Sequence, residues 1–343
     1  MSISKKITCL AIESTAHTFG VSIIEYKENK YNILSNNRDM YKTIKGGLVP
    51  VQVAEHHIEC FGKVIIDSLS KANKSIHDIN LIAFSQGPGL GHALRIGAAV
   101  ARAVSIQLNI PLIGVNHCVA HLEIGSLFGA KDPVLLYASG ANTQVIAYDG
   151  GKYRVFGETL DIGIGNFLDS FGRELGLGFP AGPKIDEMAV RAKIRNAKYI
   201  ELPYFVKGMD VSFSGSLTLL KNMIKSGKYE SEESKEDLCY SVQETLFAML
   251  LEVSERAMAH CEKKELVLGG GVACNSRLKE MAKLMCKDRD SKCIVPENQY
   301  LVDNAAMIGA LGIKMHLAGN TTSIENSMIN PYERTDDVKV NWK

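Results

Sequence analysis

Apolar and polar residues alternate in two separate stretches of the chain, and each stretch predicts a meander of three antiparallel strands. In the first, residues 7–14, 19–26 and 31–41 are rich in β-branched side chains and are separated by short polar turns. The second meander is expected over residues 133–160. Because the pattern occurs twice, the sequence predicts an internal duplication with two α/β lobes rather than a solenoid.

Apolar residues at helical spacing follow each meander. They predict helices over residues 51–71, 92–108, 117–127, 238–261 and 303–317, with buried strands at 81–89 and 111–116. The charged stretch 226–237 is expected to be exposed. No low-complexity linker separates the halves, so the lobes should share a wide contact and a cleft. We expect an N-terminal lobe over residues 1–130 and a C-terminal lobe over 131–343, with a helical insertion at about 165–260.

Composition narrows the class of protein. The chain has 343 residues, of which 46% are hydrophobic and 22% charged, as in a soluble globular protein. No apolar run is long enough to suggest a membrane span or a signal sequence. The net charge of +1 predicts that any contact with nucleic acid comes from a local patch or a partner. Eight cysteines without a CxxC pair fit reduced thiols in the cytoplasm.

Three polar, glycine-containing turns are candidates for binding phosphate. Residues 14–18 and 139–143 each place a serine, three residues and a threonine between two apolar strands. The third turn, 269–271, follows a strand and is expected to open a helix, whose dipole favours an anion. None matches the P-loop or the dinucleotide-binding fingerprint. Paired turns from two lobes are what an actin-like or sugar-kinase-like nucleotide cleft requires.

His117 and His121 lie four residues apart in a predicted helix, so that both rings face the same side. They could share a metal ion, or they could be polar groups satisfied by backbone or water. A metalloprotease HExxH motif would need glutamate after the first histidine, but Cys118 stands there. Asp303 and Tyr137 are candidates for further ligands, although spacing alone does not select them. His56 and His57 are adjacent, so a helix should turn them apart, and we expect neither to be a ligand.

Six motifs occur in order in the sequence. They span residues 116–121, 135–144, 163–186, 213–217, 266–275 and 302–309. Together they resemble the universal family that forms threonylcarbamoyladenosine in tRNA, once labelled O-sialoglycoprotein endopeptidases. The resemblance extends from about residue 7 to residue 342. Tyr137 and the tail at residues 329–342 are similar to the archaeal and eukaryotic branch.

The resemblance implies a fold, a reaction and ligands. The fold would be the actin-like, acetate-and-sugar-kinase (ASKHA) fold, with a nucleotide and metal cleft between two duplicated α/β lobes. The reaction would transfer the threonylcarbamoyl group from threonylcarbamoyl-adenylate to the N6 amine of the adenosine 3′ of the anticodon, in tRNAs that read ANN codons. Iron or zinc would be the metal, and the bound nucleotide would be threonylcarbamoyl-adenylate or ATP.

The resemblance also implies roles for single residues. One metal ion would be held by His117, His121, Tyr137 and Asp303. The phosphate side of the ligand, the adenosine and the ribose would be bound by a second set, comprising Tyr137, Ala138, Ser139, Gly140, Ala141, Asp169, Gly182, Asp186, Gly270 and Asn275. Ala181 stands where the family's usual pattern has a glycine. No general base can be identified from the sequence.

The implied partners are tRNA and the other subunits of a KEOPS-type complex, among them a kinase-like protein and a dimerising subunit. In some archaea the kinase-like domain is fused to the C-terminus, so this chain could be part of a longer polypeptide. A basic run of Arg191, Lys193, Arg195 and Lys198 either contacts RNA or forms a solvated helix face. Three other functions stay open at this stage, namely a small-molecule kinase or ATPase, a metallopeptidase and a non-catalytic scaffold.

Overall fold

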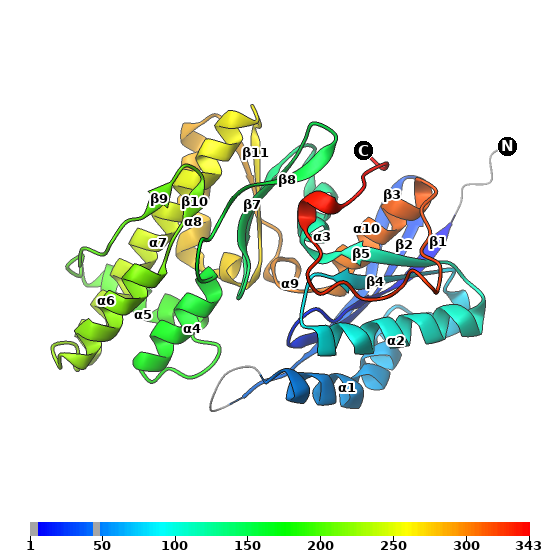
Figure 1. Ribbon diagram of the computed structural model, residues 1–343, viewed down its shortest axis with the longest axis horizontal. Helices are drawn as coiled ribbons and strands as arrows, with labels where there is room; N and C mark the ends of the chain where they lie inside the picture. The colour runs from blue at the N-terminus through cyan, green and yellow to red at the C-terminus, as the bar shows by residue number, and fades with distance from the viewer. Residues whose placement is uncertain (1–5, 44–48) are drawn as a thin grey trace.

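The computed structural model describes residues 6–43 and 49–343 and contains two five-stranded mixed sheets (Figure 1). The first has the order β3-β2-β1-β4-β5 and the second the order β12-β11-β6-β7-β8. In each sheet an antiparallel meander is followed by two strands parallel to its first strand. The predicted duplication is therefore confirmed at the level of sheet topology, and the chain has an α/β fold.

The first sheet is covered by helices on both faces. Its strands are β1 (Ile7–Glu13), β2 (Thr18–Lys27), β3 (Lys30–Met40), β4 (Leu81–Gly87) and β5 (Leu112–Asn116). Alternate residues of β1 enter two different cores. Leu10 and Ile12 pack with α1 (Pro50–Lys71) and α2 (Gly91–Leu108), whereas Cys9 and Ala11 pack with α10 (Ala305–Leu317). Every residue of β1 is buried, which explains its run of apolar residues from Cys9 to Ile12.

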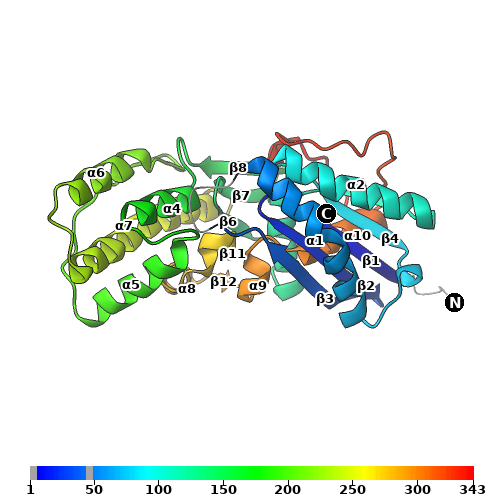
Figure 2. The same ribbon diagram turned by 90° about the horizontal axis from the view of Figure 1, so that it is seen from below.

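The second sheet carries a larger group of helices. Its strands are β6 (Val134–Ala138), β7 (Thr143–Asp149), β8 (Lys152–Glu158), β11 (Glu265–Gly269) and β12 (Lys292–Ile294). The short β9 (Val206–Lys207) and β10 (Asp210–Val211) form a separate hairpin. Figure 2 shows that most helices of this half lie on the side of the second sheet that faces away from the first half. They are α4 (Ile164–Glu174), α5 (Gly182–Ile194), α6 (Ser214–Lys225), α7 (Glu232–His260) and α8 (Ser276–Asp288). The short α9 (Asn298–Leu301) lies instead on the side of the sheet that faces the first half (Figure 2).

The chain returns to its first half at the end. After β12 and α9, helix α10 packs on β1, β2 and β4, although it lies far from them in the sequence. The division of the chain at residue 130 stays a prediction, and under it α10 is a C-terminal element on the N-terminal sheet. Within the described residues, no helix is both long and apolar enough to span a membrane.

Several predicted boundaries need correction. Residues 117–127 were predicted to form one helix. They form the shorter α3 (His117–Glu123), which is followed directly by a 3-10 helix, Ile124–Phe128. The backbone at Gly125 lies close to β11, because a Cβ added to Gly125 would come within 2.8 Å of the Val267 side chain. Helix α7 starts at Glu232, before its predicted start at about residue 238 and inside the charged stretch that was expected to be exposed. Ser231 caps it by accepting a hydrogen bond from the Ser234 backbone N–H, and acidic residues in the first turn favour a helix start.

A buried carboxylate ties α3 to other parts of the chain. Glu123 accepts hydrogen bonds from Tyr153 on β8 (2.7 Å) and from Lys314 on α10 (2.5 Å), and it pairs with Lys343 (2.9 Å). Burial alone would raise the pKa of Glu123, but the ammonium groups of Lys343 and Lys314 hold it below its ordinary value. The network thus connects both sheets through the helix that carries His117 and His121.

Replacing Glu123 by alanine is expected to lower the free energy of unfolding by about 3 kcal/mol, because three donors lose a buried acceptor at once. The matched control is Glu280→Ala, since Glu280 is 49% exposed in its side chain and pairs with Lys193 and Arg277 at the surface. The control should cost less than about 1 kcal/mol. Urea denaturation of both variants checks the difference, and equal losses would contradict the role given to Glu123.

Candidate metal and nucleotide site

Three elements meet at the predicted metal site. His117 is the first residue of α3, and the Asn116 side chain caps that helix by accepting from the Val119 N–H at 3.0 Å. Tyr137 lies near the end of β6, and its side chain is 2% exposed. Asp303 comes just before α10, whose cap Asn304 accepts from the Met307 N–H at 3.1 Å. Helix caps and a sheet strand therefore hold the three segments in place.

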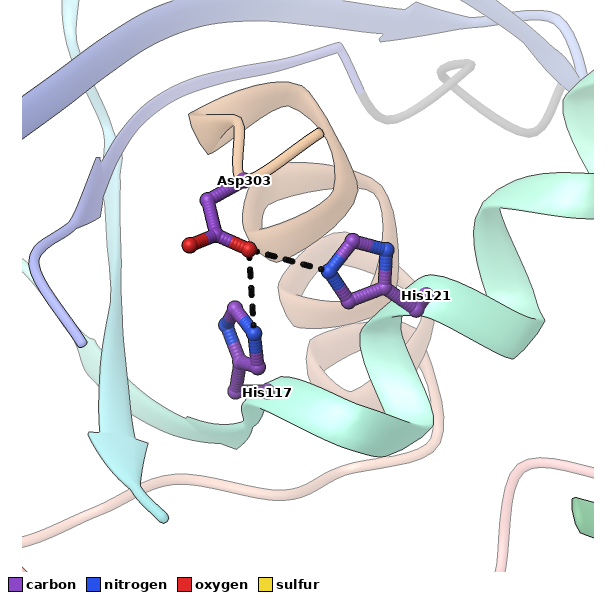
Figure 3. A group of neighbouring side chains, drawn as sticks. All are labelled: His117, His121 and Asp303. Atoms are coloured by element: carbon purple, nitrogen blue, oxygen red, sulfur yellow. Dashed lines mark hydrogen bonds and ion pairs between the residues drawn. The ribbon is translucent and has the colours of Figure 1, made fainter. Parts of the chain in front are cut away.

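The side chains of His117, His121 and Asp303 point toward one another (Figure 3). Asp303 Oδ1 is 3.4 Å from His117 Nε2 and 3.4 Å from His121 Nε2, and the three candidate ligand atoms all lie within 4.8 Å of one another. The Tyr137 hydroxyl is 2.9 Å from His117 Nε2. The structure thus brings together all four residues that the family resemblance implied as metal ligands.

Burial and charge shape the electrostatics of this cluster. Burial would lower the pKa of His117, but Tyr137, Glu13 and Asp303 raise it well above its ordinary value. Burial would raise the pKa of Asp303, yet the two imidazoles hold it well below the usual range. For His121 the cost of burial dominates and lowers its pKa. Asp303 is therefore an anion between two rings, one of which is readily neutral.

The cluster fits a transition-metal ion. It offers two imidazole nitrogens, one carboxylate and one phenol oxygen, a donor set suited to iron or zinc. His121 Nδ1 is buried without a hydrogen-bond partner among the described residues, so the Nε2–Asp303 contact is the main polar interaction of that ring. No other group of three or more histidine, cysteine or acidic side chains in residues 6–43 and 49–343 has ligand atoms as close together.

The two paired turns lie between strands, as predicted. Residues 14–17 join β1 to β2, and residues 139–142 join β6 to β7. The second turn is braced from within, because the Ser139 N–H donates to the Asn142 carbonyl at 2.9 Å. The first N–H groups of α4 donate to its other side, from Gly165 to the Ser139 carbonyl and from Asn166 to the Gly140 carbonyl. The turn backbone is consequently rigid.

The third glycine turn crosses the second one closely. Gly270 has a φ of +91°, and a Cβ on it would lie 2.3 Å from the Ala138 carbonyl oxygen and 2.9 Å from the Ser139 nitrogen. The turn was predicted to open a helix, and it opens a short 3-10 helix rather than an α-helix. A 3-10 segment, Gly271–Cys274, follows it, and α8 starts only at Ser276 with Asn275 as its cap. Gly270 is therefore both the N-cap of this 3-10 helix and the point where the backbone comes close to the end of β6.

The predicted adenosine and ribose contacts lie on α4, α5 and the start of α8. Asp169 accepts from the Ala181 N–H at 2.8 Å, just before Gly182 begins α5. Asp186 accepts from both the N–H and the hydroxyl of Ser276 at 2.9 Å. These carboxylates link neighbouring helix ends, and among the described residues the hydrogen bonds to Asp186 come only from the exposed Ser276. Burial raises the pKa of Asp169 above its ordinary value, although the hydrogen bond from the Ala181 N–H and the charge of Arg173 act to lower it.

The side-chain polar atoms of Asn275 are all hydrogen-bonded within the chain. Its carbonyl oxygen accepts from the N–H groups of Arg277 and Leu278, and its amide nitrogen bonds to Gln243 on α7. The residue is 8% exposed. Its polar atoms are thus already paired within the chain, so a contact with ribose would have to share them.

Three of the four side chains of the basic run are paired with acids, whereas Lys198 is exposed and has no ion pair among the described residues. Arg191 pairs with Glu236 at 2.5 Å, Arg195 with Asp237 at 2.8 Å, and Lys193 with Glu280 at 3.1 Å. These pairs favour the interpretation as a solvated helix face, and RNA contact there stays a prediction.

The expectation that His56 and His57 turn well apart was wrong. Their Nδ1 atoms are 3.3 Å apart, because the His56 ring also reaches Asp39 at 2.9 Å, while His57 bonds to the Ala16 carbonyl at 3.1 Å. Burial lowers the pKa of His57 to about 4. His57 braces the first turn through Ala16, and neither histidine belongs to a group of three close ligand atoms among the described residues.

Sequence reasoning missed Glu13. It ends β1, is fully buried, and contacts both the first turn and His117. The available signal was an acidic residue at the end of a mostly apolar strand directly before a polar turn, because a buried carboxylate needs several donors.

Comparison with known proteins identifies relatives along almost the whole chain. A family model described as TsaD, tRNA N6-adenosine threonylcarbamoyltransferase, matches residues 32–310. A Thermococcus kodakarensis protein named tRNA N6-adenosine threonylcarbamoyltransferase is 53% identical over 97% of this chain and 99% of its own length. A Methanosarcina mazei protein named probable bifunctional tRNA threonylcarbamoyladenosine biosynthesis protein is 50% identical over 98% of this chain but only 60% of its own length.

Solved structures support the fold. T. kodakarensis HypF is similar with a TM-score of 0.61 at 13% sequence identity, covering 93% of this chain and 49% of that protein. At this identity the likeness concerns the fold alone.

Proposed function

Because the chain belongs to the tRNA N6-adenosine threonylcarbamoyltransferase family and is an acyltransferase that forms threonylcarbamoyladenosine in tRNA, we propose a donor and an acceptor for it. The donor is threonylcarbamoyl-adenylate, and the acceptor is the N6 amine of the adenosine 3′ of the anticodon in tRNAs that read ANN codons. The observation that carries the proposal is the convergence of His117, His121 and Asp303 beside the Ser139 turn. The metallopeptidase alternative lacks the glutamate of an HExxH motif, since Cys118 follows His117, and the kinase alternative gives the two histidines no role.

Four residues would hold one iron or zinc ion, namely His117, His121, Tyr137 and Asp303. Their support is the cluster of ligand atoms and the short contact of Tyr137 with His117. When bound, such an ion supplies Lewis acidity that polarises an acyl carbonyl or stabilises negative charge on the leaving group. The sequence and the donor set do not discriminate between the two metals.

The chain's own residues would orient the two reactants. The N6 amine is a weak nucleophile because its lone pair is delocalised into the purine ring, so alignment contributes more than a strong base. Holding both reactants in the reactive orientation lowers the activation barrier by on the order of 7–11 kcal/mol. The rigid backbone from Tyr137 to Ala141, closed from behind by Gly270, would bind the adenylate phosphate and the charge that develops as AMP leaves.

The nucleoside would lie along the helix ends of the second half. Asp169, Gly182, Asp186 and Asn275 would face the adenosine and its ribose, where carboxylate oxygens accept from hydroxyl groups. Asp186 supports this role best, since its described contacts come from a single serine. In this arrangement the nucleotide spans the second lobe while its acyl phosphate points to the histidines.

The same proposal covers the architecture and the cellular setting. The repeated sheets support an actin-like, ASKHA-type fold with lobes over residues 1–130 and 131–343. A KEOPS-type complex with a kinase-like and a dimerising subunit would supply much of the tRNA surface, and the bifunctional name of longer relatives supports such a partner. All eight cysteines are free thiols, which supports a reducing, cytoplasmic compartment.

A reconstituted transfer assay tests the proposal. The chain is incubated with tRNA, synthetic threonylcarbamoyl-adenylate labelled in the threonyl group, and the kinase-like and dimerising proteins. We expect label in the tRNA only when the chain is present, and only in tRNAs with the acceptor adenosine. Equal labelling of tRNA in which that adenosine is replaced by guanosine would contradict the acceptor assignment. Label that appears only when ATP and free threonine replace the adenylate would contradict the donor assignment.

A further inference from the structure

We propose that Glu13 is a positioning residue, whose two carboxylate oxygens hold the His117 ring and the first turn of the chain in one fixed arrangement. The inference rests on the metal site proposed above, because the ring it orients is a candidate ligand. Glu13 does not contact the candidate ligand atoms His121 Nε2 and Asp303 Oδ1, so its role is to orient a ligand rather than to bind the ion.

The geometry divides the carboxylate between two tasks. Oε2 is 3.0 Å from His117 Nδ1. Oε1 accepts from the Thr15 N–H at 2.6 Å and from the Thr15 hydroxyl at 2.5 Å. Glu13 is 0% exposed, so these contacts are what offsets the cost of burying its charge.

The contact with Glu13 sets which ring nitrogen of His117 faces the cluster. A carboxylate is an acceptor only, so the ring presents Nδ1–H to Glu13. Nε2 is then the ring nitrogen that faces the Tyr137 hydroxyl at 2.9 Å and Asp303 at 3.4 Å, on the side where the metal ion would be held. His121 has no such support, because its Nδ1 is buried without a partner among the described residues. Of the two histidines, only His117 has an acid paired with its Nδ1 among the described residues.

The first turn is packed too closely to move by itself. A Cβ on Gly97 would lie 2.0 Å from Ser14 Oγ, and a Cβ on Gly89 would lie 2.5 Å from the Thr15 carbonyl oxygen. The Ser14 N–H also donates to Ser85 Oγ at 3.0 Å. Glu13 therefore anchors the His117 ring to a fixed part of the first sheet.

Glutamine cannot replace Glu13 in this role. Three donors converge on two acceptor oxygens, and an amide has only one oxygen. In a Glu13→Gln variant the amide N–H₂ must face either His117 or Thr15, so that one contact becomes donor to donor. Loss of such an outer partner typically weakens metal binding 10- to 100-fold.

The test measures zinc affinity by competition with a chromophoric chelator in the full chain. For Glu13→Gln we expect a 10- to 100-fold weaker affinity than in the parent. The matched control is Glu123→Gln, which alters another buried carboxylate on the same side of the fold that does not touch His117. It should stay within about threefold of the parent. Unchanged affinity in Glu13→Gln, or an equal loss in both variants, would overturn the proposal.

A second readout does not depend on the metal. Nitrogen-edited NMR of the metal-free parent should show a slowly exchanging, downfield Nδ1–H signal from His117, and Glu13→Ala should lack it. If the parent binds zinc no better than His117→Ala, the metal assignment fails, whereas the NMR signal still decides whether Glu13 holds the ring. Absence of the signal in the parent would refute the positioning role itself.

Discussion

Replacing His121 by alanine is expected to reduce transfer of the threonylcarbamoyl group at least about a thousandfold, while the protein stays folded. The expected loss corresponds to about 4 kcal/mol of transition-state stabilisation, within the several kcal/mol that a Lewis acid supplies. The measurement is the initial rate of tRNA labelling under saturating adenylate, together with the zinc or iron content of the purified variant. Both should fall together.

The physical reason lies in how few polar contacts the ring makes with the protein. His121 Nδ1 has no partner among the described residues, and Nε2 faces only Asp303, at 3.4 Å. Removing the ring therefore costs little in hydrogen bonds and mainly removes a ligand. The thermal midpoint of the metal-free variant should accordingly stay close to that of the metal-free parent, apart from the effect of a small cavity.

The matched control is His77→Ala, since His77 is an exposed histidine in the 3-10 segment Ile76–Asp78. Its rate and metal content should equal those of the parent. Full transfer activity by a His121→Ala protein that has lost its metal would show that the ion is not used in the reaction. Retained metal with lost activity would instead remove His121 from the ligand set.

Much of the fold could be predicted because hydrophobic periodicity reports burial. Helix α1 begins one residue before its prediction and ends where it was predicted, and both meanders occur where alternation placed them. The strand–turn–strand match of residues 14–18 with 139–143 also correctly indicated a duplicated architecture. The errors fell at helix ends, as at Glu123 and Glu232, where caps and tertiary contacts decide the boundary.

The candidate site shows the limits of the same reasoning. Helical spacing could bring His117 and His121 onto one face, but it could not select Asp303 or Tyr137, which are far away in the sequence. Those two came from the family resemblance, and the fold then places all four together. Neither helical spacing nor the family resemblance identified Glu13. Its role depends on the parallel pairing of β1 with β4 and on the position of α3, and no local sequence pattern encodes either.

Gly270→Ala is expected to abolish transfer and to lower the free energy of unfolding by about 3 kcal/mol. Two costs add at this position. The backbone φ of +91° is strained for any residue with a side chain, and the new methyl would lie 2.3 Å from the Ala138 carbonyl oxygen. Because the obstructing atoms are backbone, relief requires moving the turn after β6, which is the segment proposed to bind the adenylate phosphate.

The neighbouring Gly271 provides the control. It has no positive φ, and a Cβ placed on it meets nothing within 4 Å, so Gly271→Ala should change stability by less than about 1 kcal/mol and leave transfer within a fewfold of the parent. Calorimetry and single-turnover rates on the two variants separate the effects. If Gly270→Ala were destabilised but transferred at the parental rate at low temperature, the crossing of the two turns would be structural only, and the phosphate would have to bind elsewhere. Equal effects at both positions would mean that the strain at Gly270 is not what keeps the turn after β6 in place.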